Sequence, residues 1–300
     1  MKNFLINTLI FLLVLAGGLL VGWHYIQEDV ILYLTQVPIV ADQFDANLVT
    51  AIEEAEDTEI DDLDVITSLG AFDWIDHIGV IDELEVGPIG ELIMPSIDVR
   101  VPIFYGAHEP NISIGAGTYR PNYMWDAPEK RMGEGNLVLA SHWDPNPGIR
   151  FGGIDQIRAG DLLILRDSHY LYLYETIIEN DVVNYYRTDI AHIIDDYVWL
   201  TLFTCTPDGS QRTVVRGEFI EKLSISDLND MLEAGELEAL EVLAEVIDLE
   251  ELASVVEALD ETEVPFPVIE VAAVGGGSLL FAMLIVKFSN KGSKKKNKQK

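Results

Sequence analysis

The sequence predicts a mostly β core, folded as a closed barrel or a sandwich, between two membrane segments. Short apolar runs rich in β-branched and aromatic residues recur about every ten to twenty residues between positions 89 and 216. Pro and Gly close these runs, and no helical pattern of ten residues separates them, which is typical of all-β folds. At each end of the chain an uncharged stretch adjoins lysine, which indicates membrane segments.

These patterns divide the chain into five expected parts. They are a transmembrane anchor at 1–26, an acidic spacer at 27–85, the β core at 86–222, an acidic helical stalk at 223–266, and a transmembrane segment with a basic tail at 267–300.

The first segment, residues 4–23, has no charge and is long enough as a helix to cross a bilayer core of about 30 Å. It is longer than the apolar run of a signal peptide, and residues 22–25 make a poor cleavage site. We therefore expect an uncleaved anchor. Lys2 precedes it and Glu28 and Asp29 follow it, so the N-terminus is expected in the cytoplasm.

The spacer is acidic and poor in turn signals. Residues 51–57 and 60–66 mix acidic and apolar side chains without the regular alternation of a strand. They predict a solvated helical or irregular linker.

The predicted core begins where the acidic sequence gives way to short apolar runs. Seven runs bounded by Pro, Gly or polar residues predict its strands. These runs are 91–95, 99–105, 136–140, 162–165, 170–174, 198–202 and 213–215.

From residue 221 the spacing of apolar residues becomes that of a helix: Leu228, Met231 and Leu232 recur at intervals that place them on one helix face, among acidic residues.

The second membrane segment, 271–286, is shorter than the first, about 24 Å as a helix, and Lys287 can extend it by snorkelling. The lysine-rich tail belongs on the cytoplasmic side, which places both termini inside and 27–266 outside the cell. The alternative is an amphipathic tail that lies on the membrane surface.

Composition excludes several classes of protein. Hydrophobic residues at 49% argue against a disordered chain. The net charge is −32, and because lysines concentrate at the ends, the middle of the chain is near −40, which excludes a nucleic-acid binder. A single cysteine, Cys205, excludes a disulfide framework and a thiolate-rich zinc site. It is either an inert buried thiol or a nucleophile.

The candidate site residues are His142, Cys205 and Arg212. Cys205 ends an apolar run just before the turn sequence Pro-Asp-Gly, where a thiol is accessible, and His142 ends another run. Arg212 and Arg216 share one face of the strand that follows the turn. His169 opens a polar turn and is expected to be solvated, and we expect His24, His77, His108 and His192 to be structural or exposed. On the residues alone, the set indicates a Cys–His enzyme.

Several motifs in this region resemble those of sortases. TLFTC at 201–205 matches the family's T-L-x-T-C signature, and SQRTVVRGE at 210–218 matches its arginine strand. GAGT at 115–118 and MGEGNLVLASH at 132–142 resemble the segment that leads to the family histidine, and IGELIMPSI at 89–97 resembles the opening strand. With FDW at 72–74, the resemblance covers about 72–222 and is to housekeeping class A enzymes. It implies a closed sortase-type β-barrel.

The resemblance also implies a mechanism. Sortases cleave an LPXTG-type sorting signal of a secreted protein between Thr and Gly. Cys205 would attack as a thiolate to form a thioester, and His142 would protonate the leaving amine. Arg212 would stabilise the oxyanion, with Arg216 as the rival arginine. The acceptor would be an amine of the peptidoglycan precursor, and membrane lipid would surround the anchor.

Some features depart from the class A pattern. A C-terminal span is typical of pilin-polymerising class C sortases, and residues 206–209 resemble their Thr-Pro-x-Gly, but 27–88 has no clear match to their Asp-Pro-aromatic lid. We favour wall anchoring. We predict no cofactor, with calcium as an alternative, since pairs such as Asp195-Asp196 are common in a chain this acidic.

Two other classes remain as alternatives. An L,D-transpeptidase also uses Cys and His, but close together in sequence, whereas His142 and Cys205 lie far apart. A membrane-tethered binding module would not need these residues.

Overall fold

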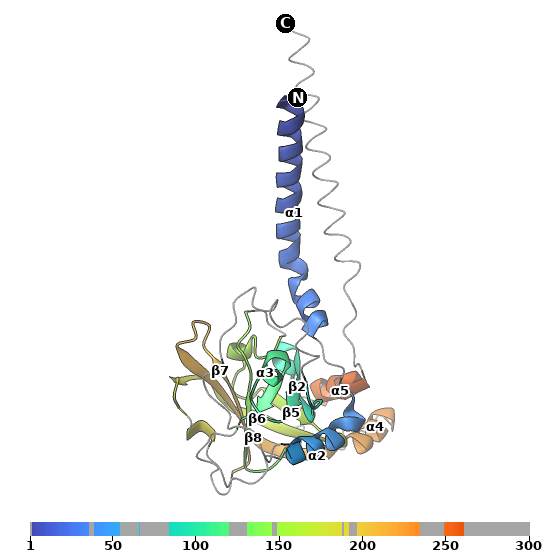
Figure 1. Ribbon diagram of the computed structural model, residues 1–300. Helices are drawn as coiled ribbons and strands as arrows, with labels where there is room; N and C mark the ends of the chain where they lie inside the picture. The colour runs from blue at the N-terminus through green and yellow to red at the C-terminus, as the bar shows by residue number, and fades with distance from the viewer. Residues whose placement is uncertain are drawn as a thin grey trace. The chain divides into compact units, whose positions relative to one another are not determined.

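The computed structural model describes residues 2–35, 39–54, 66, 84–119, 131–145, 149–187, 189–191, 197–234 and 249–260. The chain divides into two units, Met1–Leu34 with Val264–Lys300, and Thr35–Glu263. Helix α1 (Lys2–Thr35) accounts for the described part of the first unit (Figure 1). Within it, Leu5–Gly22 has a mean hydropathy of 2.4 and is long and apolar enough to cross a membrane. The predicted span at 271–286 lies outside the described residues.

Among the described residues of the second unit, eight strands close into a barrel in the order β1-β2-β3-β4-β7-β8-β6-β5 (Figure 1). The pairs β2–β3 and β4–β7 are parallel, and the other pairs are antiparallel. The predicted mostly β, closed fold is confirmed. The strands are β1 (Gly90–Met94), β2 (Val99–Phe104), β3 (Ala116–Thr118), β4 (Asn136–Ala140), β5 (Leu162–Arg166), β6 (Tyr170–Asn184), β7 (Trp199–Cys205) and β8 (Gln211–Ser224).

Several strands, among them β4 and β7, are mostly apolar because both of their faces are buried. Leu139 and Leu202 belong to one core cluster, whereas their neighbours Val138 and Phe203 belong to a second. Side chains alternate between the two faces of a strand, so an element covered on both sides needs apolar residues at every position.

Three strands differ from the sequence prediction. β6 and β8 are longer than predicted, pair along most of their length and contain register shifts, so their polar ends carry no clear alternation. β3 is only three residues long. It passes so close to a neighbouring loop that a Cβ at Gly117 would lie 2.3 Å from the carbonyl oxygen of Gly106. Glycine permits this close approach because it has no side chain. For the same reason it adds nothing to an alternating apolar pattern, so the sequence does not predict the strand.

Helices α4 (Ile225–Ala234) and α5 (Leu249–Glu257) are the described parts of the predicted stalk. Both pack against the barrel: Leu228 and Leu252 share a buried cluster with Ile164 and Leu173. The helical prediction therefore fits these residues, but they do not form a free stalk. Their apolar faces cover the outer side of β1, β5 and β6, which would otherwise be exposed.

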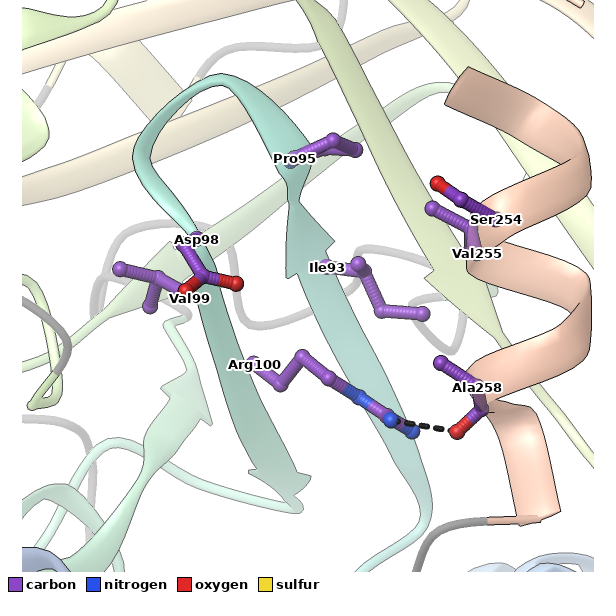
Figure 2. A pocket seen from close by; sticks show the side chains of 8 residues that line it. All are labelled: Ile93, Pro95, Asp98, Val99, Arg100, Ser254, Val255 and Ala258. Carbon is purple, nitrogen blue, oxygen red and sulfur yellow. Dashed lines mark hydrogen bonds between the residues drawn. The ribbon is translucent and has the colours of Figure 1, made fainter. Parts of the chain in front are cut away.

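Polar contacts fasten the end of α5 to the barrel. Arg100 Nη1 donates to the carbonyl oxygen of Ala258 at 2.7 Å (Figure 2), and Arg166 Nη1 donates to that of Leu259 at 2.8 Å. The fully buried carboxylate of Glu91 accepts from Arg100 Nε at 2.8 Å and lies 3.4 Å from Arg166 Nη1. The arginines thus satisfy helix-terminal carbonyls, and Glu91 balances their charge. A pocket of about 160 Å³ remains beside this contact.

The predicted solvated spacer is wrong at the positions that the structure describes as buried. Helix α2 (Phe44–Glu54) packs against the barrel core through Leu48, and its Phe44 and Ala51 are 0% and 6% exposed. Ile66 is fully buried in the same cluster as Phe203. The many acidic residues predicted a solvated region, but some of its apolar residues are buried against the barrel, which composition alone does not show.

Candidate active site

Cys205 and Arg212 lie opposite each other on neighbouring strands. Cys205 is the last residue of β7 and pairs with Arg212 near the start of β8. The predicted turn joins them: Gly209 has a φ of 70°, and Asp208 Oδ1 accepts from Thr206 Oγ1 at 2.7 Å. Hydrogen bonds, that from Thr206 foremost, lower the pKa of Asp208. The turn therefore fixes the thiol against the guanidinium.

Arg212 is fully buried and held from three directions. Its Nη1 donates to Cys205 Sγ and, at 2.5 Å, to the carbonyl oxygen of Ile66. Its guanidinium carbon lies 3.8 Å from the centroid of the Tyr185 ring. Stacking on an aromatic ring suits a planar cation and sets the direction of its donors.

The Cys205 thiol is 1% exposed and donates to the carbonyl oxygen of Ile66 at 3.0 Å. Burial raises the pKa of this thiol, while the charge of Arg212 and its hydrogen bond oppose that shift. With Ile66 in place, the neutral thiol is therefore favoured. Arg212 is the contact that stabilises the thiolate.

His142 lies at the same end of the barrel, two residues beyond β4. β4 runs parallel to β7 with Ala140 opposite Phe203, and Thr204 Oγ1 donates to the carbonyl oxygen of Ser141 at 2.8 Å. The register offset is 63 residues, which is also the sequence separation of His142 and Cys205. Strand pairing therefore brings together two residues that the sequence keeps far apart.

The His142 side chain is 2% exposed, and its Nε2 lies 2.7 Å from Oε1 of Glu109. Glu109 precedes helix α3 (Asn111–Ile114) and also accepts a short hydrogen bond from Ser113 Oγ. A carboxylate thus faces the imidazole from a different part of the chain.

The structure separates Arg212 from its rival, Arg216. Arg216 pairs with Thr201, four residues before Cys205, and its Nε donates to Thr201 Oγ1 at 3.0 Å. Its guanidinium carbon lies 4.5 Å from the centroid of the Trp199 ring. Burial lowers the pKa of Arg216. The contacts of Arg216 are with the first half of β7 and with the carbonyl oxygen of Ile190, whereas Arg212 contacts the thiol at the end of β7.

The side chains of the remaining histidines are either exposed or outside the described residues. His169 and His108 are exposed, and His169 Nε2 lies 3.5 Å from Asp45 Oδ2, as expected of a surface residue. The side chain of His24 and all of His77 and His192 lie outside the described residues.

Within the described ranges, no group of three or more His, Cys, Asp or Glu side chains is arranged to hold a metal ion. The pair Asp195-Asp196 lies outside these ranges.

Sequence reasoning missed two residues of the site, Glu109 and Ile66. Glu109 is one acidic residue among 51, and nothing near it in the sequence relates it to His142. For Ile66 the available signal is the apolar pair Val-Ile in the Asp-Val-Ile-Thr stretch, but the surrounding acidic residues concealed that Ile66 is buried.

Comparison with known proteins agrees with these motifs. Residues 92–220 match the family model for the sortase domain. Sortase A of Bacillus anthracis is 29% identical over 136 residues, which are 44% of this chain and 60% of that protein. Sortase A of Listeria monocytogenes is 32% identical over 142 residues, 45% of this chain and 59% of that protein. The chain thus spans about three fifths of the length of these curated relatives.

Solved structures are also similar. The Listeria monocytogenes sortase A structure is 28% identical, with 46% of this chain and 90% of that chain covered and a TM-score of 0.41. Sortase C-3 of Streptococcus pneumoniae is 18% identical, with 66% and 93% covered and a TM-score of 0.46. The residues of the domain match include His142, Cys205 and Arg212. Residues 92–220 therefore match the sortase domain, and over this region the chain is similar to sortase A proteins.

Proposed function

We propose that this protein is a membrane-anchored cysteine transpeptidase that attaches secreted proteins to the cell wall. It cleaves an LPXTG-type sorting signal between Thr and Gly and transfers the acyl group to an amine of the peptidoglycan precursor. The observation that carries the proposal is the contact of Arg212 with Cys205, with His142 at the end of the neighbouring parallel strand. The catalytic domain is outside the cell, and both termini are cytoplasmic.

In the first half of the reaction, Cys205 gives its proton to His142, and the thiolate attacks the threonine carbonyl carbon. Arg212 donates to the resulting oxyanion, a role that suits a permanently charged, rigidly held guanidinium. The Thr–Gly bond then breaks, His142 protonates the leaving glycine amine, and a thioester remains on Cys205.

In the second half, the acceptor amine attacks the thioester carbonyl and gives a proton to His142. The C–S bond breaks, His142 returns this proton to the thiolate, and the Cys205 thiol is restored. The burial of His142 and Cys205 supports transfer to an amine over hydrolysis, because it limits the access of water to the thioester.

A peptide assay tests this proposal. The full chain in detergent is incubated with a sorting-signal peptide and a short amine acceptor, and the cleaved and transferred products are identified by mass. Cys205→Ala and His142→Ala should abolish both products, whereas His169→Ala, at an exposed histidine, should not. Retention of cleavage by Cys205→Ala would exclude the mechanism. Transfer only to an amine on a pilin subunit would favour the pilin alternative.

A further inference from the structure

We propose that Glu109 is a positioning residue for His142. Glu109 fixes the orientation of the His142 imidazole and stabilises its protonated form. This inference rests on the proposed function, since it adds a fourth residue to Cys205, His142 and Arg212. The motifs that identified those three residues do not include Glu109.

The geometry of the contact sets the proton positions on the ring. Nε2 of His142 lies 2.7 Å from Oε1 of Glu109, within hydrogen-bond distance. An ionised carboxylate can only accept, so Nε2 carries a proton in this arrangement. The neutral ring then has its lone pair on Nδ1, and the charged ring has its transferable proton there. Nδ1 is therefore the atom that exchanges protons with Cys205 and the leaving amine.

Glu109 is held in place by contacts other than His142. Ser113 Oγ donates to its second oxygen, Oε2. Ser113 is 1% exposed, and its carbonyl oxygen accepts from Arg150 Nε at 2.6 Å. The carboxylate can therefore orient the ring, because its own position does not depend on the ring.

Arg150 connects this carboxylate to the loop that follows His142. It is 3% exposed, and its Nη1 donates at 2.5 Å to Asp144 Oδ2, two residues beyond His142. Burial lowers the pKa of Arg150, while Asp144 and Glu109 act against that shift. The positive charge of Arg150 in turn favours the ionised form of Glu109. Asp144, Arg150, Ser113 and Glu109 thus form one connected polar support on this side of His142.

The exposure of Glu109 argues for a role beyond packing. Its side chain is 46% exposed, so the fold gains little from burying it, yet it contacts a histidine that is 2% exposed. An imidazolium in such a buried position needs a nearby negative charge, and Glu109 supplies one.

The kinetic part of the test separates charge from shape. The full chain in detergent micelles is assayed for cleavage of the sorting-signal peptide as the wild type, Glu109→Gln, Ser113→Ala and, as a control, Glu134→Gln. Gln keeps the size of Glu but removes its charge. Glu109→Gln should lower kcat about tenfold with KM within about twofold of the wild type, a part of what general acid–base catalysis contributes. Ser113→Ala should give a smaller loss, and the exposed Glu134 should give none.

A spectroscopic part does not depend on activity. Nitrogen-15 NMR of the histidine-labelled full chain reports which ring nitrogen is protonated, and His142→Gln identifies the signal by its loss. The wild type should carry its proton on Nε2, and Glu109→Ala should shift the population toward the other tautomer. Thermal unfolding confirms that each variant is folded.

The two parts together decide the proposal. A loss of kcat accompanied by a tautomer shift supports it. A kcat within twofold of the wild type for Glu109→Gln, or an unchanged tautomer in Glu109→Ala, overturns it. If the wild type cleaves no sorting-signal peptide, the proposed function fails, and the tautomer measurement still decides whether Glu109 positions the ring.

Discussion

Replacing Ile66 with Ala should improve substrate binding, because Ile66 and a substrate compete for the same two donors. The carbonyl oxygen of Ile66 accepts from Cys205 Sγ at 3.0 Å and from Arg212 Nη1 at 2.5 Å. Under the proposed mechanism, the substrate carbonyl must reach both of these groups. Substrate can therefore react only when Ile66 has moved away.

The size of the effect follows from the burial of the Ile66 side chain, which is 0% exposed. Burying an isoleucine side chain contributes about 1.5–3 kcal/mol, and Ile66→Ala loses most of it, about 2 kcal/mol. That corresponds to about a 30-fold shift toward the open arrangement, in which Ile66 has moved away from Cys205 and Arg212, because each 1.4 kcal/mol changes an equilibrium constant tenfold. Apparent affinity scales with the fraction of open molecules, so KM should fall by up to this factor while kcat stays the same.

Two measurements check this prediction. The first is KM for a sorting-signal peptide, and the second is the rate at which iodoacetamide alkylates Cys205 near neutral pH. Alkylation should accelerate, because uncovering the thiol removes the burial that raises its pKa and leaves the opposing charge of Arg212. Val49→Ala serves as the matched control, since Val49 is 57% exposed in the same N-terminal region.

Unchanged KM and alkylation rates in Ile66→Ala would refute the reasoning. They would mean that the Ile66 carbonyl does not limit access to Cys205. A cooperative thermal unfolding transition in Ile66→Ala would show that the barrel is still folded and that the change acts on the site.

Other predictions concern the arginine, the docking of α5, the topology and the charge. Arg212→Ala should abolish peptide cleavage while Arg216→Ala retains most of it, and the reverse result would assign the oxyanion role to Arg216. Glu91→Ala should destabilise the domain by about 3 kcal/mol, since it leaves the buried Arg166 and the partly buried Arg100 without their counter-charge, and lower the unfolding midpoint by about 6–12 °C. Glu218→Ala, at an exposed acid of β8, should change the midpoint little, and equal shifts in the two variants would contradict the role of Glu91. A reporter that works only in the cytoplasm should be active when fused after Lys300, and its inactivity would show that 271–286 does not span the membrane. A peptide with a downstream lysine cluster should have the higher kcat/KM at about 0.01 M salt, an advantage that should vanish near 1 M as screening increases, whereas equal rates throughout would leave the acidity without a role in catalysis.

Much of the fold was predictable because it depends on local patterns. The runs that became β1, β4, β5 and β7 are apolar and bounded by turn residues, and burial on both faces keeps them so. Strand β3 was not predictable, since three small residues carry no alternation. The packing of α4 and α5 was not predictable either, because an amphipathic pattern indicates a helix but not the surface that it covers.

The sequence by itself was enough to select Cys205, His142 and Arg212 as candidate site residues, because each stands at or beside an apolar run in a motif that can be read residue by residue. Only the tertiary structure decided what surrounds them. The pairing of β4 with β7 at an offset of 63 residues brings His142 to the end of the barrel where Cys205 lies. Glu109, just before α3, and Ile66, from the acidic N-terminal region, also reach the site, and the local sequence around each does not predict which residue it contacts. The physical reason is that strand pairing and burial are long-range interactions, which act between segments that local sequence patterns do not connect.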